Sequence, residues 1–265
     1  MPALGYTIGI DEYFYFNGAT AGLVAGGSMT EESEPREIRT IGDWRPAQIR
    51  EAMARVFGNV SLVLQDKALI SYAKRNANGR LTAFTAEGGH TAENKLHNAC
   101  KMDTLSLECV AGGELRANMN WKGIYGQDGS GGVMSPSADK CLMWFEGAMA
   151  GIAGVELTGF SLNINHNTDW VPVIDNTLTP KRAAKYIREG NQILTANLRF
   201  LQSEGIDLMA DALDYISSVT IAFVGTNTVT LTLTDLKRGT HERPLNPGEL
   251  IEFSHNYAVR DFNIS

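Results

Sequence analysis

The chain has 265 residues, a formal net charge of -7 and an apolar fraction of 43%. Such a length can hold one large or two smaller domains with a buried core, and the composition excludes a wholly disordered chain. The acidic balance argues against a protein that grips nucleic acid by its phosphates, because that requires a basic face. The sequence contains no run of about 18 apolar residues, so no membrane span is predicted, and no secretory signal is expected.

Helices are expected at two places in the first half of the chain. Between Trp44 and Phe57 the apolar residues follow a helical period, with Pro46 near the start and Gly58 just past the end. A shorter helix is predicted over 66–74. These are the only helix signals in this half.

Strands dominate the rest of the first half. Apolar and polar residues alternate over 104–109 and again over 115–121, and a short turn at 111–113 separates the two segments. This pattern predicts a β-hairpin. The Gly- and Ser-rich stretch from Gly126 to Ser137 is predicted to be a linker.

The second half shows the same mixture of strands and short helices. Alternation predicts strands around Gly159, over 229–234 and over 251–264. The apolar phase changes at Gly159, which predicts a β-bulge, and it changes once more within the last strand. Short helices are predicted over 180–189 and 205–216.

Short matching segments occur in the same order in both halves, at a nearly constant offset. The matched segments are Phe16–Gly22 with Phe145–Gly151, Gly26 and Ser28 with Gly159 and Ser161, Pro46 with Pro180, Leu64–Gln65 with Leu201–Gln202, and Gly113–Leu115 with Gly248–Leu250. We therefore predict an internal duplication, with repeats at 1–137 and 138–265. The expected fold is mainly β: two repeats of a β-sandwich or barrel, each with a short flanking α-helix.

No residue is assigned a catalytic, cofactor-binding or metal-binding role. His97 and Cys100 have a ligand-like spacing, but no second pair completes a tetrahedral metal site. The sequence has no phosphate-binding glycine loop of the usual pattern and no nucleophile elbow. The three cysteines cannot all pair, so free, buried thiols in a reducing compartment are expected. The chain is expected not to be an enzyme.

Four tryptophans leave a second interpretation open, a duplicated β-sandwich that binds carbohydrate or peptide through aromatic side chains. The candidates for such contacts are Trp44, Trp121, Trp144 and Trp170. Trp121 and Trp144 lie in the apolar phase of strand-like segments, so they are predicted to belong to the core.

Several stretches resemble the major tail tube protein (tail tube monomer) family of long-tailed bacteriophages. In the second half these stretches are 154–167, 171–173, 180–190, 193–201 and 249–265. In the first half, 35–41 and 46–64 look like a more diverged copy. The segment 46–57 departs from the family's usual turn, because it is more basic and has a helical pattern.

This resemblance implies a structural virion protein that self-assembles into stacked rings, forming the hollow tail tube through which the genome is delivered. Two copies of the fold per chain imply a trimeric ring with pseudo-sixfold symmetry; a hexameric ring is the alternative. The implied partners are further copies of the chain, the tape measure protein and the tail initiator and terminator proteins. DNA would pass through the lumen without specific binding, and no membrane is involved.

The same resemblance implies localisation in the virion tail after assembly in the host cytoplasm. An acidic lumen would repel DNA phosphates and let the duplex slide. Long loops at 17–27, 128–139 and 236–248 are expected to make contacts between stacked rings.

Overall fold

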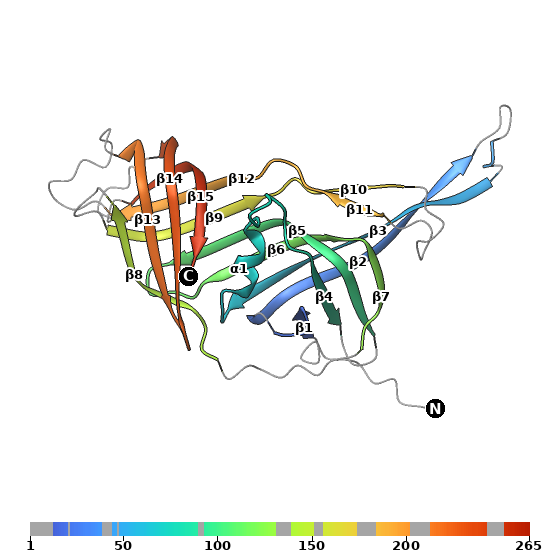
Figure 1. The fold of residues 1–265 in the computed structure, drawn as a ribbon, viewed down its shortest axis with the longest axis horizontal. Helices are drawn as coiled ribbons and strands as arrows, with labels where there is room; N and C mark the ends of the chain where they lie inside the picture. The colour runs from blue at the N-terminus through green and yellow to red at the C-terminus, as the bar shows by residue number, and fades with distance from the viewer. Residues whose placement is uncertain are drawn as a thin grey trace.

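The computed structural model describes residues 13–20, 22–38, 44–46, 48–89, 93–130, 139–150, 156–173, 184–201, 213–242 and 252–265 (Figure 1). The elements in the first half are β1 Tyr13–Phe16, β2 Gly22–Ile38, β3 Gln48–Leu64, α1 Ala68–Ala73, β4 Phe84–Gly89, β5 Asn94–Val110, β6 Arg116–Gly123 and β7 Tyr125–Asp128. In the second half they are β8 Met143–Ala150, β9 Glu156–Asn165, β10 Asp169–Val171, β11 Tyr186–Arg188, β12 Ile193–Leu201, β13 Tyr215–Val224, β14 Thr228–Glu242 and β15 Glu252–Ile264. The protein is mainly β, as predicted.

One predicted helix is confirmed and one is wrong. The helix over 66–74 is present as α1, which buries Leu69 and Ile70. The helix predicted over 44–57 is not formed, because its residues from Gln48 onwards belong to strand β3. This strand is hydrogen-bonded to β2 along one edge and to β6 along the other. Within the predicted segment, the ladder with β2 begins at Gln48 and the ladder with β6 begins at Val56, and these backbone hydrogen bonds outweigh a short helical pattern.

The two helices predicted in the second half are also wrong where the structure describes them. Tyr186–Arg188, at the end of the segment 180–189, forms strand β11 and pairs with β10. Ile216, the last residue of the segment 205–216, is buried in strand β13. Residues 180–183 and 205–212 lie outside the described residues.

The predicted strand features are largely confirmed. Strands β5 and β6 form the expected hairpin, with Leu105 opposite Met119. The β9–β12 ladder has its irregularity at Thr158, the residue before Gly159, as the change of apolar phase predicted. The predicted linker is wrong at its start, because Gly126–Asp128 belong to β7 and pair with β5.

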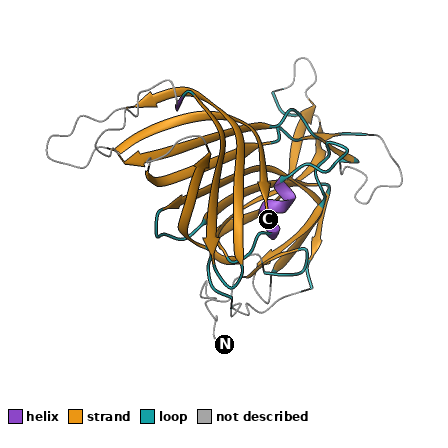
Figure 2. Ribbon diagram, turned by 60° about the vertical axis from the view of Figure 1, so that its left-hand side comes forward, coloured by secondary structure: helices purple, strands orange, loops and turns teal. Residues whose placement is uncertain are grey.

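Thirteen of the strands form a single sheet (Figure 2), whose main path is β2-β3-β6-β5-β9-β12-β15-β14-β13-β8. Strand β5 joins the halves: its early residues pair with β4, whereas its late residues pair with β9 of the second half. Within each half the sheet folds over on itself. Phe14 of β1 therefore packs against Trp121 of β6, and Trp144 of β8 packs against Phe160 of β9.

The strand order is the same in the two halves: β2-β3-β6-β5-β4-β1 in the first and β9-β12-β15-β14-β13-β8 in the second. The hydrogen-bond register is also the same. Ser28 lies opposite Asn59 in β2–β3, and Ser161 lies opposite Asn197 in β9–β12, so a serine faces an asparagine at the equivalent place in each half.

Two of the irregularities in these ladders also coincide between the halves. Ala25 interrupts β2–β3 where Thr158, its equivalent in the second half, interrupts β9–β12. Asp103 interrupts β5–β6 where its equivalent Gly239 interrupts β14–β15. Bulges are specific local features of a strand pair, so their agreement extends the similarity beyond the order of the strands.

The core of each half is built around a large aromatic side chain. Trp121 in β6 and Tyr257 in β15 are both fully buried, and they occupy the same position in the two registers. Trp121 packs directly over Gly58 of the neighbouring strand β3. A Cβ atom on Gly58 would lie 2.3 Å from Trp121 Cζ2 and 2.6 Å from the Ser28 carbonyl oxygen.

We expect Gly58→Ala to lower the free energy of unfolding by about 1–3 kcal/mol, because the tryptophan and the strand backbone must move to admit the methyl group. Urea unfolding followed by tryptophan fluorescence measures this change. Gly26→Ala is the control, since a Cβ atom there meets no heavy atom within 4 Å. Equal effects of the two substitutions would contradict the predicted clash.

Candidate functional site

The face of the sheet that points away from the core carries a row of neutral polar side chains. Ser61, Asn118, Ser106, Asn163 and Thr195 are consecutive cross-strand partners on β3, β6, β5, β9 and β12. The row passes from the first half to the second without a break, at the step from Ser106 to Asn163. We call the surface formed by this row and the two rows beside it the polar face.

The neighbouring rows of the polar face are also mostly neutral, although one of them continues from Ser161 to the charged residues Glu108 and Arg116. One contains Ser28, Asn59, Asn120, Thr104 and Asn165, and the other contains Ser161, Asn197 and Asn256. Side chains within these rows are hydrogen-bonded to one another. Asn59 Nδ2 donates to Ser28 Oγ at 2.7 Å, and Asn120 Nδ2 donates to Thr104 Oγ1 at 2.6 Å.

The second half repeats this network. Asn197 Nδ2 donates to Ser254 Oγ at 2.7 Å and lies 2.8 Å from Asn256 Oδ1. Charged groups on the face are partly balanced, because Glu108 lies directly opposite Arg116. The polar face is thus an extended surface of amide and hydroxyl groups that offers many weak hydrogen bonds and little net charge.

The two ends of this surface are strand edges. Among the described strands, β2 pairs with β3 alone, so its other edge has no partner strand. Strand β14 pairs with β13 only as far as Lys237. The next residue, Arg238, donates a hydrogen bond from its backbone N–H to the Asp214 carbonyl oxygen. Beyond that point, Thr240–Glu242 pair with β15 on one side and with no described strand on the other. Such edges are ready to accept a further strand.

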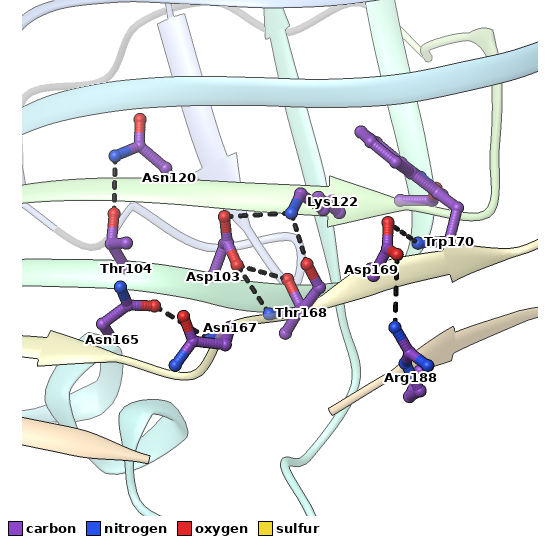
Figure 3. Close-up of polar contacts among 11 residues, drawn as sticks. Asp103, Thr104, Asn120, Lys122, Asn165, Asn167, Thr168, Asp169, Trp170 and Arg188 are labelled. Carbon is purple, nitrogen blue, oxygen red and sulfur yellow. Dashed lines mark hydrogen bonds and ion pairs between the residues drawn. The ribbon is translucent and has the colours of Figure 1, made fainter. Parts of the chain in front are cut away.

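Polar contacts reinforce the junction where β5 meets β9 (Figure 3). The carboxylate of Asp103 accepts hydrogen bonds from the backbone N–H and the hydroxyl of Thr168, at 2.8 and 2.6 Å. Lys122 Nζ lies 3.2 Å from Asp103 and also donates to the Thr168 carbonyl. Trp170 Nε1 donates to the Gly123 carbonyl oxygen at 3.0 Å. The two halves are therefore joined by side chains as well as by the strand ladder.

A second polar cluster across the junction centres on Glu189, whose side chain is 10% exposed. It accepts hydrogen bonds from Lys101 Nζ and from the Leu81 N–H, and it lies near Arg75. Burial alone would raise the pKa of Glu189. The hydrogen bonds from Lys101 and Leu81, together with the charges of Lys101 and Arg75, outweigh burial and lower the pKa. The Glu189 carboxylate of the second half thus stays charged between Lys101 and Arg75 of the first half.

The residues considered for metal and ligand binding in the sequence have other contacts. The buried His97 ring accepts a hydrogen bond at Nδ1 from Trp121 Nε1, at 3.2 Å. Burial raises the pKa of the Cys100 thiol to about 12. The described parts of the chain contain no group of three His, Cys, Asp or Glu side chains arranged to hold a metal. Cys100, Cys109 and Cys141 are free thiols, and the first two are buried as predicted.

The tryptophans do not gather at one place. Trp121 and Trp144 are buried, which confirms the prediction that they belong to the core. Trp44 is 77% exposed. Trp170 lies at the junction, with Lys122 Nζ 5.2 Å from its ring centre, and it contacts the first half instead of forming an open aromatic platform.

All three loops predicted for ring stacking overlap strands, two of them over several residues. Gly22–Gly27 belong to β2, and Leu236–Glu242 belong to β14, so the loops at 17–27 and 236–248 are shorter than expected. Asp128 ends β7, and residues 131–138 lie outside the described part of the chain. The apolar alternation at 229–234 had indicated β14, but nothing in the sequence marked where it ends.

A mainly β chain with a continuous polar face and open strand edges can associate with further copies through its sheet. The chain matches the family described as "Phage tail tube protein" over residues 14–259. Because this match covers nearly the whole chain, the protein belongs to that family. It is a structural protein of the phage tail tube, and the virion tail is its location. No curated protein matches the sequence. No helix among the described residues is long and apolar enough to span a membrane.

Proposed function

We propose that the chain self-assembles into stacked rings that form the hollow tail tube and serve as the conduit for the genome. Family membership supports the tube. The observation that carries the finer proposal is the polar face, a nearly neutral surface that runs unbroken through both halves. Its two ends are strand edges, so copies of the chain can continue it.

The polar face is proposed to line the lumen. DNA phosphates bind strongly to clustered Lys and Arg, which this face largely lacks. Neutral amides and hydroxyls such as those of Asn118 and Ser106 form hydrogen bonds to one another or to water. They carry no charge that could bind the phosphates of a passing duplex. A neutral wall replaces the acidic wall that the net charge of the chain suggested. Specific binding of DNA is not part of the proposal.

We further propose that the chain is an internal duplication, with repeats at 1–137 and 138–265, and that three chains make a pseudo-sixfold ring. The identical strand order, the matching register and the coincident bulges support the duplication. Six repeats then surround the lumen. The tape measure protein and the tail initiator and terminator proteins are the proposed partners of the finished tube, which assembles in the host cytoplasm.

Electron microscopy of the purified chain over a concentration series tests the ring and its stoichiometry. We expect hollow tubes built from rings of three two-lobed subunits. Rings of six complete chains would contradict the trimer, and the absence of rings and tubes at every concentration would contradict self-assembly.

Gold labelling of the same tubes tests the position of the polar face. In a chain whose partly exposed Cys141 is replaced by Ser, Asn120→Cys places a thiol at an exposed position, where it can be biotinylated before assembly. Gold-conjugated streptavidin is expected to bind at tube ends only, because the lumen excludes it along the sides. Gold along the outer walls would show that the polar face points outward. Free biotinylated subunits provide the control for accessibility.

A further inference from the structure

The junction between the two halves predicts how neighbouring chains join. We propose that the free edge of β2 in one chain pairs antiparallel with the free edge of β14 in the next chain, from Thr240 onwards, in the register of the internal β5–β9 junction. This inference rests on the proposed ring. The partner is a second copy of the same chain.

The equivalence of strands carries the argument. In the first half β5 continues beyond its pairing with β4, and its late residues accept β9. The counterpart of β5 is β14, which likewise continues beyond its pairing with β13. The counterpart of β9 is β2, whose outer edge has no described partner strand. The relation between the two halves, applied once more, therefore places the outer edge of β2 from one chain against the free segment of β14 in another. These two edges lie at opposite ends of the polar face.

The internal register gives the register between chains. Thr104 lies opposite Asn165 in the β5–β9 ladder. The equivalent of Thr104 in β14 is Thr240, because each residue directly follows the bulge of its strand. The equivalent of Asn165 in β2 is Glu32, in the alignment that superposes the bulges of β2 and β9. The pair therefore becomes Thr240 opposite Glu32, and one step further His241 lies opposite Glu31.

Backbone hydrogen bonds show which type of cross-strand pair Thr104 and Asn165 form. The His166 N–H donates to the Asp103 carbonyl at 2.9 Å, just outside the Thr104–Asn165 pair. Thr104 and Asn165 are therefore a non-hydrogen-bonded pair, the type in which facing residues approach most closely. Thr240 of one chain and Glu32 of the next are expected to be such a pair, with Cβ atoms about 4.5–5.5 Å apart.

The two edges differ in charge. Strand β2 carries consecutive acidic residues, Glu31 and Glu32, on the segment proposed to pair. The free segment of β14 carries His241 and a single acidic residue, Glu242, because Arg238 is ion-paired with Asp214 and Lys237 lies opposite Tyr215 of β13. Pairing β2 against a second β2 would place carboxylates side by side, which disfavours that pairing relative to β2 against β14. The contact is thus directed from one edge to the other, which closes a ring instead of forming a two-fold dimer.

Disulfide trapping in assembled tubes tests this register. Cys141 is replaced by Ser to reduce background, and the chain then carries Glu32→Cys and Thr240→Cys. Tubes are assembled under reducing conditions, confirmed by microscopy, oxidised and analysed on non-reducing gels. We expect most of the chain to shift into covalent dimers and trimers, with the ladder ending at the closed trimer. Each single-cysteine chain should remain monomeric.

Ser28→Cys with Thr240→Cys is the matched control, since Ser28 is exposed on the same strand as Glu32 and lies about 13 Å from it along the strand. It should remain largely monomeric. Tubes that form but are linked through Ser28 and not Glu32, or through neither, overturn the proposed junction and leave the tube itself intact. A parent chain that forms no rings or tubes overturns the proposed function, and the junction with it.

Discussion

Lowering the pH from 7 to 5 is expected to destabilise the free subunit strongly, because His97 and His166 are held neutral in the folded state. Burial, aided by the charge of Lys95, lowers the pKa of His97 to about 4. Burial, aided by the charge of Arg75, lowers the pKa of His166 to about 4. A histidine in the unfolded chain titrates near pH 6.5. Below that pH the unfolded chain therefore binds more protons than the folded chain, which lowers the free energy of unfolding.

The sign of the effect follows from this difference. The stabilisation is complete above about pH 6.5 and is lost as the pH falls towards 4, at about 1.4 kcal/mol per pH unit for each histidine. Protonation of His97 at Nδ1 would also remove the acceptor for Trp121 Nε1. Urea unfolding at several pH values between 7 and 5 measures the slope, in a range above the usual pKa values of carboxyl groups.

His97→Gln is the informative variant, since an amide oxygen can still accept the tryptophan N–H but does not titrate. The slope of stability against pH should fall by about half in this variant, and further when His166→Gln is added. Because the slope is compared, a general loss of stability in the variants does not obscure the result. An unchanged slope in both variants would contradict the prediction.

Removing the charge of Glu189 is expected to cost about 3 kcal/mol of unfolding free energy, because Lys101 and Arg75 would be left half-buried without their counter-ion. Glu189→Gln preserves the size of the side chain and its ability to accept from the Leu81 N–H. The substitution therefore isolates the charge. Chemical unfolding at pH 7 measures the loss.

Asp128→Asn is the control, since the Lys95–Asp128 pair is also close, at 2.8 Å, but Asp128 is 89% exposed. This substitution should leave the unfolding midpoint unchanged. Because the pKa of Glu189 is lowered, its stabilisation is present above the usual glutamate pKa and is lost as the pH falls below it. A Glu189→Gln chain as stable as the parent would show that the cluster adds nothing to the junction.

Local patterns predicted the features that depend on neighbouring residues. The hairpin of β5 and β6 and the bulge before Gly159 follow from an apolar alternation that one buried face imposes. The helix predicted at 44–57 is wrong for the opposite reason: β3 is fixed by pairing with β2, the strand before it, and with β6, which lies far along the chain, although its own sequence also fits a helical period. Strand pairing of this kind is not encoded within the segment itself.

The duplication remains a proposal, and the hydrogen-bond register agrees with only some of the sequence matches on which it was based. The sequence match of Gly26 with Gly159 is also the match that the hydrogen-bond register gives. In β3 and β12, however, the register matches Val63 with Leu201, so the sequence match of Leu64 with Leu201 is one position out. Gly- and Ala-rich matches recur by chance, whereas paired strands allow one register.

Part of the polar face could have been predicted from the sequence. The outward positions of the predicted hairpin are Thr104, Ser106, Asn118 and Asn120, a choice of neutral groups where exposed strands commonly carry charge. What the sequence could not show is that β9 and β12 extend the same rows, because the β5–β9 pairing joins residues far apart in the chain.

The junction of β5 and β9 also bears on how the proposed rings would form from dilute subunits. In the proposed ring of three duplicated chains, three of the six inter-repeat contacts would be made within a chain before any two molecules meet. Each such contact is spared the loss of translational and rotational freedom, which amounts to roughly 4–15 kcal/mol for an association between separate molecules. Tethering holds the repeats at an effective concentration on the order of millimolar. Fusion of two repeats thus halves the number of encounters needed to close a ring, at subunit concentrations where separate repeats would stay dispersed.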